Sequence, residues 1–185
     1  MTSQPKLLHG RRGANTGPSK AEQIKAGSHH LRGSVAEELE NGAEAFRSDT
    51  LVILTHHGAY QHDDRDLRSV VLPDGSKPPR AQRMMVRSKI TGGQLTSDQM
   101  LMHLDICDEL GNGTLRATTR QALQLHGVPK GNVKEAIRRI NQALLTTLGA
   151  SGDINRNVMC CPAPYADDPA REQIRQMAES LSSAL

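Results

Sequence analysis

The sequence predicts an α+β fold, in which two helices cover one face of a small sheet. Polar and apolar side chains alternate over residues 82–90 and again in the segments TLRATT (114–119) and QALQLH (121–126), as expected of half-buried strands. Apolar residues recur at helical spacing over 96–110 and over 132–149. Strands and helices that follow one another in this order predict a mixed α+β domain.

Residues 1–80 predict little buried structure of their own. Residues 1–20 are rich in Gly, Ser, Pro and basic side chains, and they predict a flexible tail. Residues 21–80 are expected to form an extended segment that wraps over the rest of the chain and ends in a linker. Within this segment we expect a short helix at 36–42, a strand at LVIL (51–54) and the Pro-rich linker at 73–80.

The regular pattern begins with a strand at 82–90, whose apolar residues share one side while Arg87 lies on the other. A capped helix at 96–110 follows, because Ser, Thr and Asp stand at its start and Asn112-Gly113 ends it. This strand and helix open the predicted domain.

The two short strands at 114–119 and 121–126 come next, and a helix at 132–149 follows them. The segment RNVMC (156–160) predicts a last strand. The resulting order is β-α-β-β-α-β, the split or ferredoxin-like arrangement, and we expect it to form a half-domain over 81–165.

Residues 166–185 predict a separate C-terminal helix. Asp168 can cap its first turn, and Pro169 fits the first helical position. Three apolar residues recur at helical spacing, so we expect them to face inward: Ile174, Met177 and Leu181.

The composition indicates a thin core and a mildly basic chain. Hydrophobic residues make up 36% of the sequence and aromatic residues only 2%, so the core must be aliphatic, and we expect something else to complete it. The net charge of +3 is too small to indicate nucleic acid, but it suits an anionic ligand if the positive charge is concentrated.

Several classes of protein are excluded. No Phe, Tyr or Trp lies between residues 61 and 164, so a sheet that stacks nucleic-acid bases is not expected. The adjacent pairs His29-His30 and His56-His57 lack the spacing of a metal site on a helix. No apolar run could span a membrane. Three cysteines without a CxxC pair or a secretory signal favour a reducing compartment, and we expect the cytoplasm.

Polar side chains gather on one face of the predicted sheet. If both helices cover the other face, this face carries several cationic and polar groups that match an anion. Water alone could also solvate such a face. The residues expected there are Arg87, Arg116, Thr118, Arg120, Gln124 and His126.

Five segments resemble one known family. They are TLRATTRQALQLHGVPKGNVKEAIRRIN (114–141), TLGASGDINRNVMCCPAPY (147–165), MMVRSKITGG (84–93), HLRGSVAEELENG (30–42) and HHGAYQHDDRDLR (56–68). Together they resemble the N-terminal half of assimilatory sulfite reductases, siroheme-dependent enzymes of the nitrite/sulfite reductase family. The resemblance covers about residues 19–185.

The resemblance implies a six-electron reduction of sulfite to sulfide, at a siroheme coupled to a 4Fe-4S cluster, in sulfur assimilation. It implies that Arg87 and Arg156 hold sulfite and that five residues bind the siroheme carboxylates: Arg116, Thr118, Arg120, Gln124 and His126. The expected electron donor is ferredoxin, with an NADPH flavoprotein subunit as the alternative.

One departure from the family and two alternatives bear on this hypothesis. The run Gln124-Leu125-His126-Gly127 favours sulfite over nitrite, because the related ferredoxin-nitrite reductases tend to have arginine in place of the histidine. The family's cluster cysteines and catalytic lysines belong to its C-terminal half, and Cys160-Cys161 are expected to be strand residues rather than cluster ligands. We therefore expect the chain alone to be inactive, as a fragment or as half of a split enzyme. A non-catalytic siroheme- or anion-binding module is the other alternative.

Overall fold

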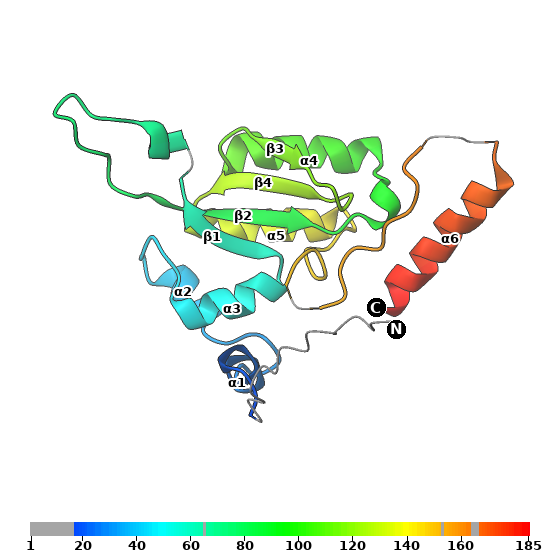
Figure 1. The fold of residues 1–185 in the computed structure, drawn as a ribbon, viewed down its shortest axis with the longest axis horizontal. Coiled ribbons are helices and arrows are strands. Elements are labelled where there is room, and N and C mark those ends of the chain that lie inside the picture. Colours follow the sequence, from blue (N-terminus) through cyan, green and yellow to red (C-terminus); the bar gives the residue numbers. More distant parts are fainter. Residues whose placement is uncertain (1–16, 65, 153, 164–166) are drawn as a thin grey trace, which may run out of the picture.

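The computed structural model describes residues 17–185 except 65, 153 and 164–166. Most of the predicted tail, residues 1–16, lies outside the described residues. Figure 1 shows a sheet at the centre, small helices below one edge of it, and a last helix that projects to the side.

The sheet contains four antiparallel strands in the order β1-β2-β4-β3. The strands are β1 (Ala59–Asp63), β2 (Gln82–Ser88), β3 (Leu115–Ala117) and β4 (Leu123–Val128). The chain runs from β2 through α4 (Ser97–Leu110) to the β3-β4 hairpin and on to α5 (Val133–Gln142). This is the predicted α+β, ferredoxin-like order up to its second helix.

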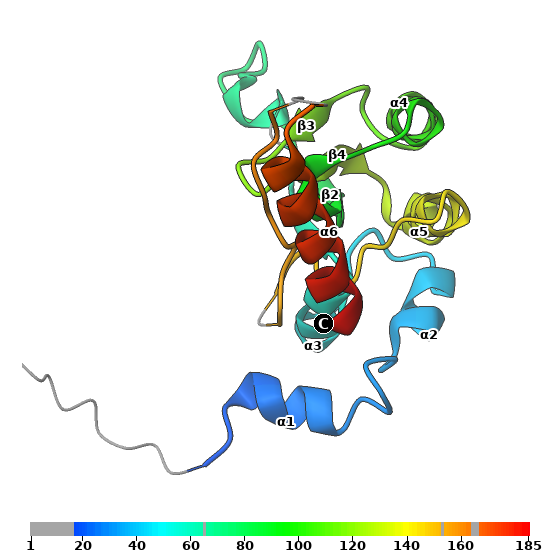
Figure 2. The same ribbon diagram turned by 90° about the vertical axis from the view of Figure 1, so that its right-hand side faces the viewer.

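Helices α4 and α5 both cover the same face of the sheet (Figure 2). The core between the two layers is aliphatic, as the composition predicts, and its fully buried members include Met84, Val86, Ile106, Leu125 and Ile140. Four further helices are α1 (Lys20–Ala26), α2 (Val35–Glu40), α3 (Ser48–His56) and α6 (Pro169–Ala184), and short 3-10 turns lie at η1 (Asp66–Ser69), η2 (Thr91–Gly93) and η3 (Lys130–Asn132).

The N-terminal segment differs from its prediction. LVIL is part of α3 and not a strand, and it buries Ile53 and Leu54. The polar segment after it forms β1 instead, with Tyr60 paired to Met85 and His62 paired to Arg83. Part of the segment expected to wrap over the domain therefore belongs to the sheet, because β1 pairs with β2.

The predicted last strand at 156–160 is also wrong, because β1 takes the edge position beside β2. This segment instead ties two loops together through the carboxamide of Asn157. Its Nδ2 donates to the carbonyls of Ile90 at 2.7 Å, Arg120 at 2.8 Å and Gln121 at 3.1 Å.

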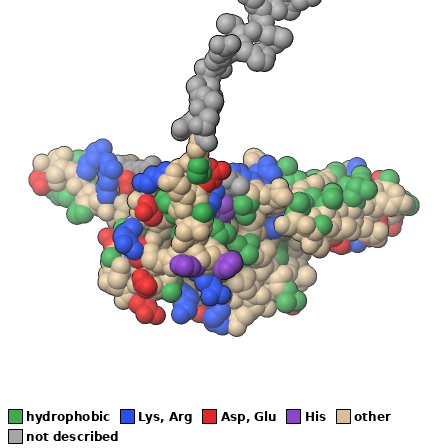
Figure 3. Space-filling model, turned by 90° about the horizontal axis from the view of Figure 1, so that it is seen from below, with side chains coloured by type: hydrophobic (Ala, Val, Ile, Leu, Met, Phe, Trp, Pro, Cys, Tyr) green, Lys and Arg blue, Asp and Glu red, His purple; other side chains and the backbone are tan. Residues whose placement is uncertain are grey.

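Two helices depart from their predicted extents or faces. α5 ends at Gln142 rather than at 149, because Leu144 takes a φ of 59° and the chain then pairs Thr146 with Lys89. The apolar stripe of α6 faces outward, and its residues Ile174, Met177 and Leu181 are 49%, 65% and 51% exposed. Figure 3 shows hydrophobic side chains gathered on the arm that projects to the right. Within the described part of the chain, no helix combines the length and apolarity that crossing a membrane requires.

Candidate anion-binding site on the open sheet face

The sheet face opposite α4 and α5, called here the open face, carries a row of polar side chains across three strands. Arg116 of β3 pairs with Gln124 of β4, and Gln124 pairs with Arg87 of β2. Their chain neighbours Leu125 and Val86 point into the core and are fully buried. The period-two alternation therefore places these three side chains together, as the sequence predicts.

Arg87 is held in place from several sides. The carboxamide of Gln124 is oriented with its oxygen toward Arg87. This oxygen accepts a hydrogen bond from Nε of Arg87 at 2.9 Å and another from Nη2. Nη1 of Arg87 donates to the carbonyl of Ala150 at 3.4 Å. The guanidinium also lies 5.8 Å from the ring centre of Tyr60, within the range of a cation–π contact. Gln124 thus orients Arg87 directly.

Positive charge is concentrated around Arg87. Burial lowers the pKa of its guanidinium, Tyr60 opposes this effect, and the nearby charges of Arg156 and Arg120 lower the pKa further. Because arginine stays charged in proteins, the effect of Arg156 and Arg120 on this pKa means that the three guanidinium groups repel one another. An anion bound between them would relieve that repulsion.

The turn between β3 and β4 positions Arg120. The hydroxyl of Thr118 accepts hydrogen bonds from the backbone N–H of Ala122 at 3.1 Å and, more weakly, of Arg120 at 3.4 Å. Gln121 takes a φ of 54° in this turn, and Asn157 holds its carbonyl. Nε of Arg120 is buried and finds no partner within the described residues. Thr118 therefore fixes the turn, and Arg120 presents an unsatisfied donor.

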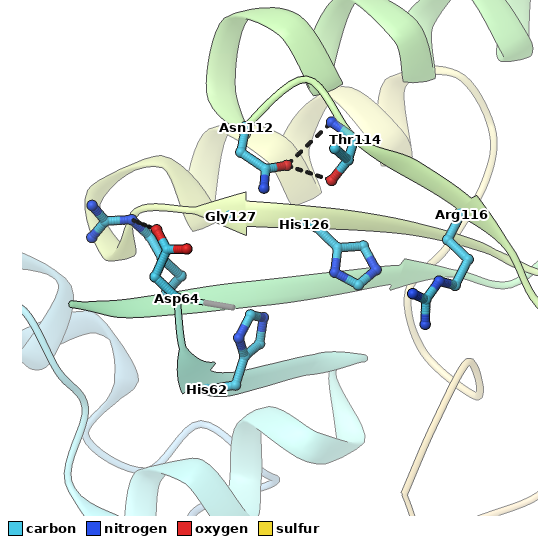
Figure 4. A pocket seen from close by; sticks show the side chains of 8 residues that line it. His62, Asp64, Asn112, Thr114, Arg116, His126 and Gly127 are labelled. Atoms are coloured by element: carbon cyan, nitrogen blue, oxygen red, sulfur yellow. Dashed lines mark hydrogen bonds and ion pairs between the residues drawn. The ribbon is translucent and has the colours of Figure 1, made fainter. Parts of the chain in front are cut away.

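The remaining predicted residues lie at the two ends of the row. His126 of β4 is 8% exposed, and its ring lies 6.2 Å from that of His62 of β1, a residue that the sequence did not single out (Figure 4). Arg156 is exposed, and its Nε donates to the carbonyl of Gly152 at 3.3 Å. Arg116 makes no hydrogen bond or ion pair with any described residue.

His62 was missed because its strand was missed. The segment YQHDD is polar at nearly every position, and period-two alternation is visible in it only once β1 is known to pair with β2. No local sequence signal distinguishes this edge strand from a charged loop.

The donor set matches an anion better than a metal ion. Arginine, histidine and carboxamide donors face one surface, and buried nitrogens of Arg120 and His62 have no partner within the described residues. Residues 17–185, apart from those left undescribed, contain no group of three or more His, Cys, Asp or Glu side chains that could hold a metal ion. The chain's three cysteines could not complete a four-cysteine cluster site.

Comparison with known proteins finds a family match for the central region of the chain. The family model described as the nitrite/sulfite reductase ferredoxin-like half domain matches residues 78–143. The sulfite reductase (NADPH) hemoprotein beta-component of Geobacillus thermodenitrificans is 43% identical over 169 residues, which are 91% of this chain and 29% of that protein. The protein of the same name from Staphylococcus saprophyticus is 42% identical over 89% of this chain and 28% of its own length.

A solved structure supports the fold. The Mycobacterium tuberculosis NirA protein matches with a TM-score of 0.63 and 23% identity, over 88% of this chain and 32% of that one. The chain thus spans less than a third of the length of these relatives. The curated relatives are named for NADPH, and this goes against the expectation that ferredoxin is the electron donor.

Proposed function

Because the chain belongs to the nitrite/sulfite reductase family and resembles the N-terminal half of its members, we propose that it serves as the siroheme- and sulfite-binding half of a sulfite reductase. The observation that carries this proposal is the row of cationic donors on the open face, with Arg116 and Nε of Arg120 lacking partners within the described residues. Such a surface is complementary to the ring of carboxylates on siroheme.

Five side chains would hold the cofactor. Arg116 and Arg120 would bind carboxylates through their planar guanidinium groups, and His126 would add a ring nitrogen. Gln124, whose oxygen accepts from Arg87, would donate through its NH₂ group, and Thr118 would act through the turn that carries Arg120. When bound, siroheme would supply the electron transfer to sulfite, which no side chain of this chain can perform.

Arg87 and Arg156 would bind sulfite. Fixed positive charge beside the sulfite oxygens polarises the S–O bonds and favours their protonation. Arg87 suits this role because Gln124, Tyr60 and the Ala150 carbonyl hold its guanidinium in one orientation, so little reorganisation is needed.

The 4Fe-4S cluster does not fit this chain. Three cysteines are too few, and Cys107 is buried in the core. We propose that the C-terminal half of the same family architecture supplies the cluster. The names of the relatives favour an NADPH-linked partner component as the electron source.

Titration with siroheme, followed by its absorbance, tests the proposal. The wild-type chain should bind siroheme, and Arg120→Ala should bind it roughly tenfold or more weakly, because a charge-assisted hydrogen bond is lost. Arg138→Ala is the matched control, since Arg138 lies on α5, away from the open face, and pairs with Glu135. Absence of binding by the wild type would contradict the proposal.

The same titration separates the two roles. Arg87→Ala and Arg156→Ala should retain siroheme but lose most of the absorbance change that sulfite causes in the loaded chain. Loss of siroheme in either variant, to the extent seen in Arg120→Ala, would overturn the division between substrate and cofactor residues.

A further inference from the structure

A small cavity lies at the end of the open face, beyond the row that holds Arg87. It has a volume of about 180 Å³, and His62, Asn112, Arg116 and His126 contribute to its lining (Figure 4). These residues come from β1, β3, β4 and the loop that follows α4. Neither the sequence pattern nor the family resemblance assigns a role to His62 or Asn112.

The ring of His62 is fixed by a hydrogen bond. Its Nδ1 lies 2.7 Å from the carbonyl of Asp63, and a carbonyl oxygen can only accept, so Nδ1 carries the proton. Nε2 is therefore the nitrogen left for a ligand. It is buried and has no partner within the described residues.

Asn112 turns its donor end away from its own loop. Its Oδ1 accepts from the backbone N–H of Thr114 at 3.1 Å and from the Thr114 hydroxyl at 2.6 Å. The NH₂ group must therefore face the other way, over Gly127. This close approach requires glycine, because a Cβ at position 127 would lie 2.4 Å from Cβ of Asn112 and because φ there is 66°.

The charge balance of the cavity favours an anion. Arg116 contributes a guanidinium that has no partner among the described residues. The acidic group at the far end, Asp64, lies 3.9 Å from Nε of Arg83, and Arg83 also pairs with Glu44 at 3.2 Å. The carboxylate of Asp64 is thus offset by its own partner, whereas the charge of Arg116 is not.

We propose that this cavity is a subsite for one peripheral carboxylate of the bound macrocycle, with His62 and Asn112 as direct ligands beside Arg116 and His126. The inference rests on the proposed function, because siroheme provides the carboxylate. With Nδ1 of His62 donating to the Asp63 carbonyl, Nε2 is the nitrogen that would bond to the carboxylate. The other charged or titratable groups that line the cavity with His62 are Asp64, Arg83, Arg116 and His126.

Siroheme titration of two variants tests this subsite. Asn112→Asp keeps the acceptor for Thr114 but replaces the donor with a carboxylate, and it should weaken siroheme binding roughly tenfold. Asn141→Asp is the matched control, since it adds the same charge on an exposed position of α5 and should leave binding unchanged. His62→Phe should weaken binding by roughly threefold to tenfold, because it removes one polar contact to a charged group.

A further readout separates binding from folding. The methyl ester of siroheme should bind weakly, and it should not distinguish Asn112→Asp from the wild type. If the wild type binds siroheme and both variants bind it equally well, the subsite is overturned and the proposed function stands. If the wild type does not bind siroheme, both are overturned.

Discussion

Neighbouring residues of β2 send polar side chains to opposite faces of the sheet, and the two faces satisfy them differently. On the covered face, Ser88 is fully buried and lies 2.7 Å from Nε2 of His103 on α4. Nδ1 of His103 lies 2.7 Å from the carbonyl of Gln99, so it donates there and Nε2 accepts from the Ser88 hydroxyl. Burial lowers the pKa of His103, which favours the neutral ring that this arrangement needs.

On the open face, some polar groups are not satisfied by the described residues. Nε of Arg120 and Nε2 of His62 are buried without a partner among those residues, and Arg116 is exposed. Arg87 is held, but two other arginines oppose its charge. Buried polar groups of folded proteins nearly always find partners. The covered-face groups thus complete one another within the fold, and the unpaired open-face groups are the ones for which we propose a ligand.

The largest effect on stability is expected where a buried charge is satisfied internally. Glu38 of α2 is 3% exposed and accepts hydrogen bonds from the backbone N–H of Arg47 at 2.8 Å, from Nε of Arg47 at 2.9 Å, from Ser34 at 2.9 Å and from Thr50. Burial alone would raise the pKa of Glu38, but these bonds outweigh it and lower the pKa to about 2.

We therefore expect Glu38→Gln to lose roughly 2–3 kcal/mol of the free energy of unfolding at pH 7. The folded-state pKa lies below the unfolded value of 4.5, so the contribution is complete above pH 4.5 and is lost as the pH falls toward 2. Urea unfolding at pH 7 and pH 3 measures this. Equal pH dependence of the wild type and the variant would contradict the role of Glu38.

A smaller loss is expected from Ser88→Ala, which leaves Nε2 of His103 buried without a donor. The free energy of unfolding should fall by about 1–2 kcal/mol. Ser180→Ala on α6 is the control, because its exposed hydroxyl bonds only to the carbonyl of Gln176 within the same helix. If the two variants unfold alike, the covered-face pair does not contribute as described.

The smallest effect, of opposite sign, is expected on the open face. Arg120→Met removes an unsatisfied donor and one of the charges that oppose Arg87, so the free energy of unfolding should rise by roughly 0.5 kcal/mol. The gain should shrink in high salt, because salt screens the repulsion. A loss of stability in this variant would show that Arg120 is held by the fold itself.

The part of the fold that the sequence predicts is the part with clear periodicity. Residues 82–88, 115–117 and 123–128 alternate in polarity because one face of the sheet packs against α4 and α5, and α4 starts at a capping box between Thr96 and Gln99. The segment LVIL shows no periodicity of apolar and polar residues, because four consecutive apolar residues fit a buried strand or a helix equally well. The edge strand β1 was hidden because its composition is polar.

The contrast between strands with visible and hidden periodicity also explains which site residues could be predicted. The open-face arginines and His126 lie on strands whose alternation is visible, so their common side could be predicted. His62 lies on the hidden strand β1. Asn112 looked like a helix stop signal, and its place over Gly127 depends on the packing of a loop against β4. Local patterns carry no information on such long-range contacts.

The most direct test of the account compares one residue from each face in the same two assays. Arg116→Ala and Ser88→Ala would each be measured for siroheme affinity and for the free energy of unfolding. The account predicts that Arg116→Ala loses roughly tenfold or more in affinity with stability nearly unchanged, and that Ser88→Ala loses stability with affinity unchanged. Parallel losses in both assays for both variants would contradict the division of the sheet into a structural face and a binding face.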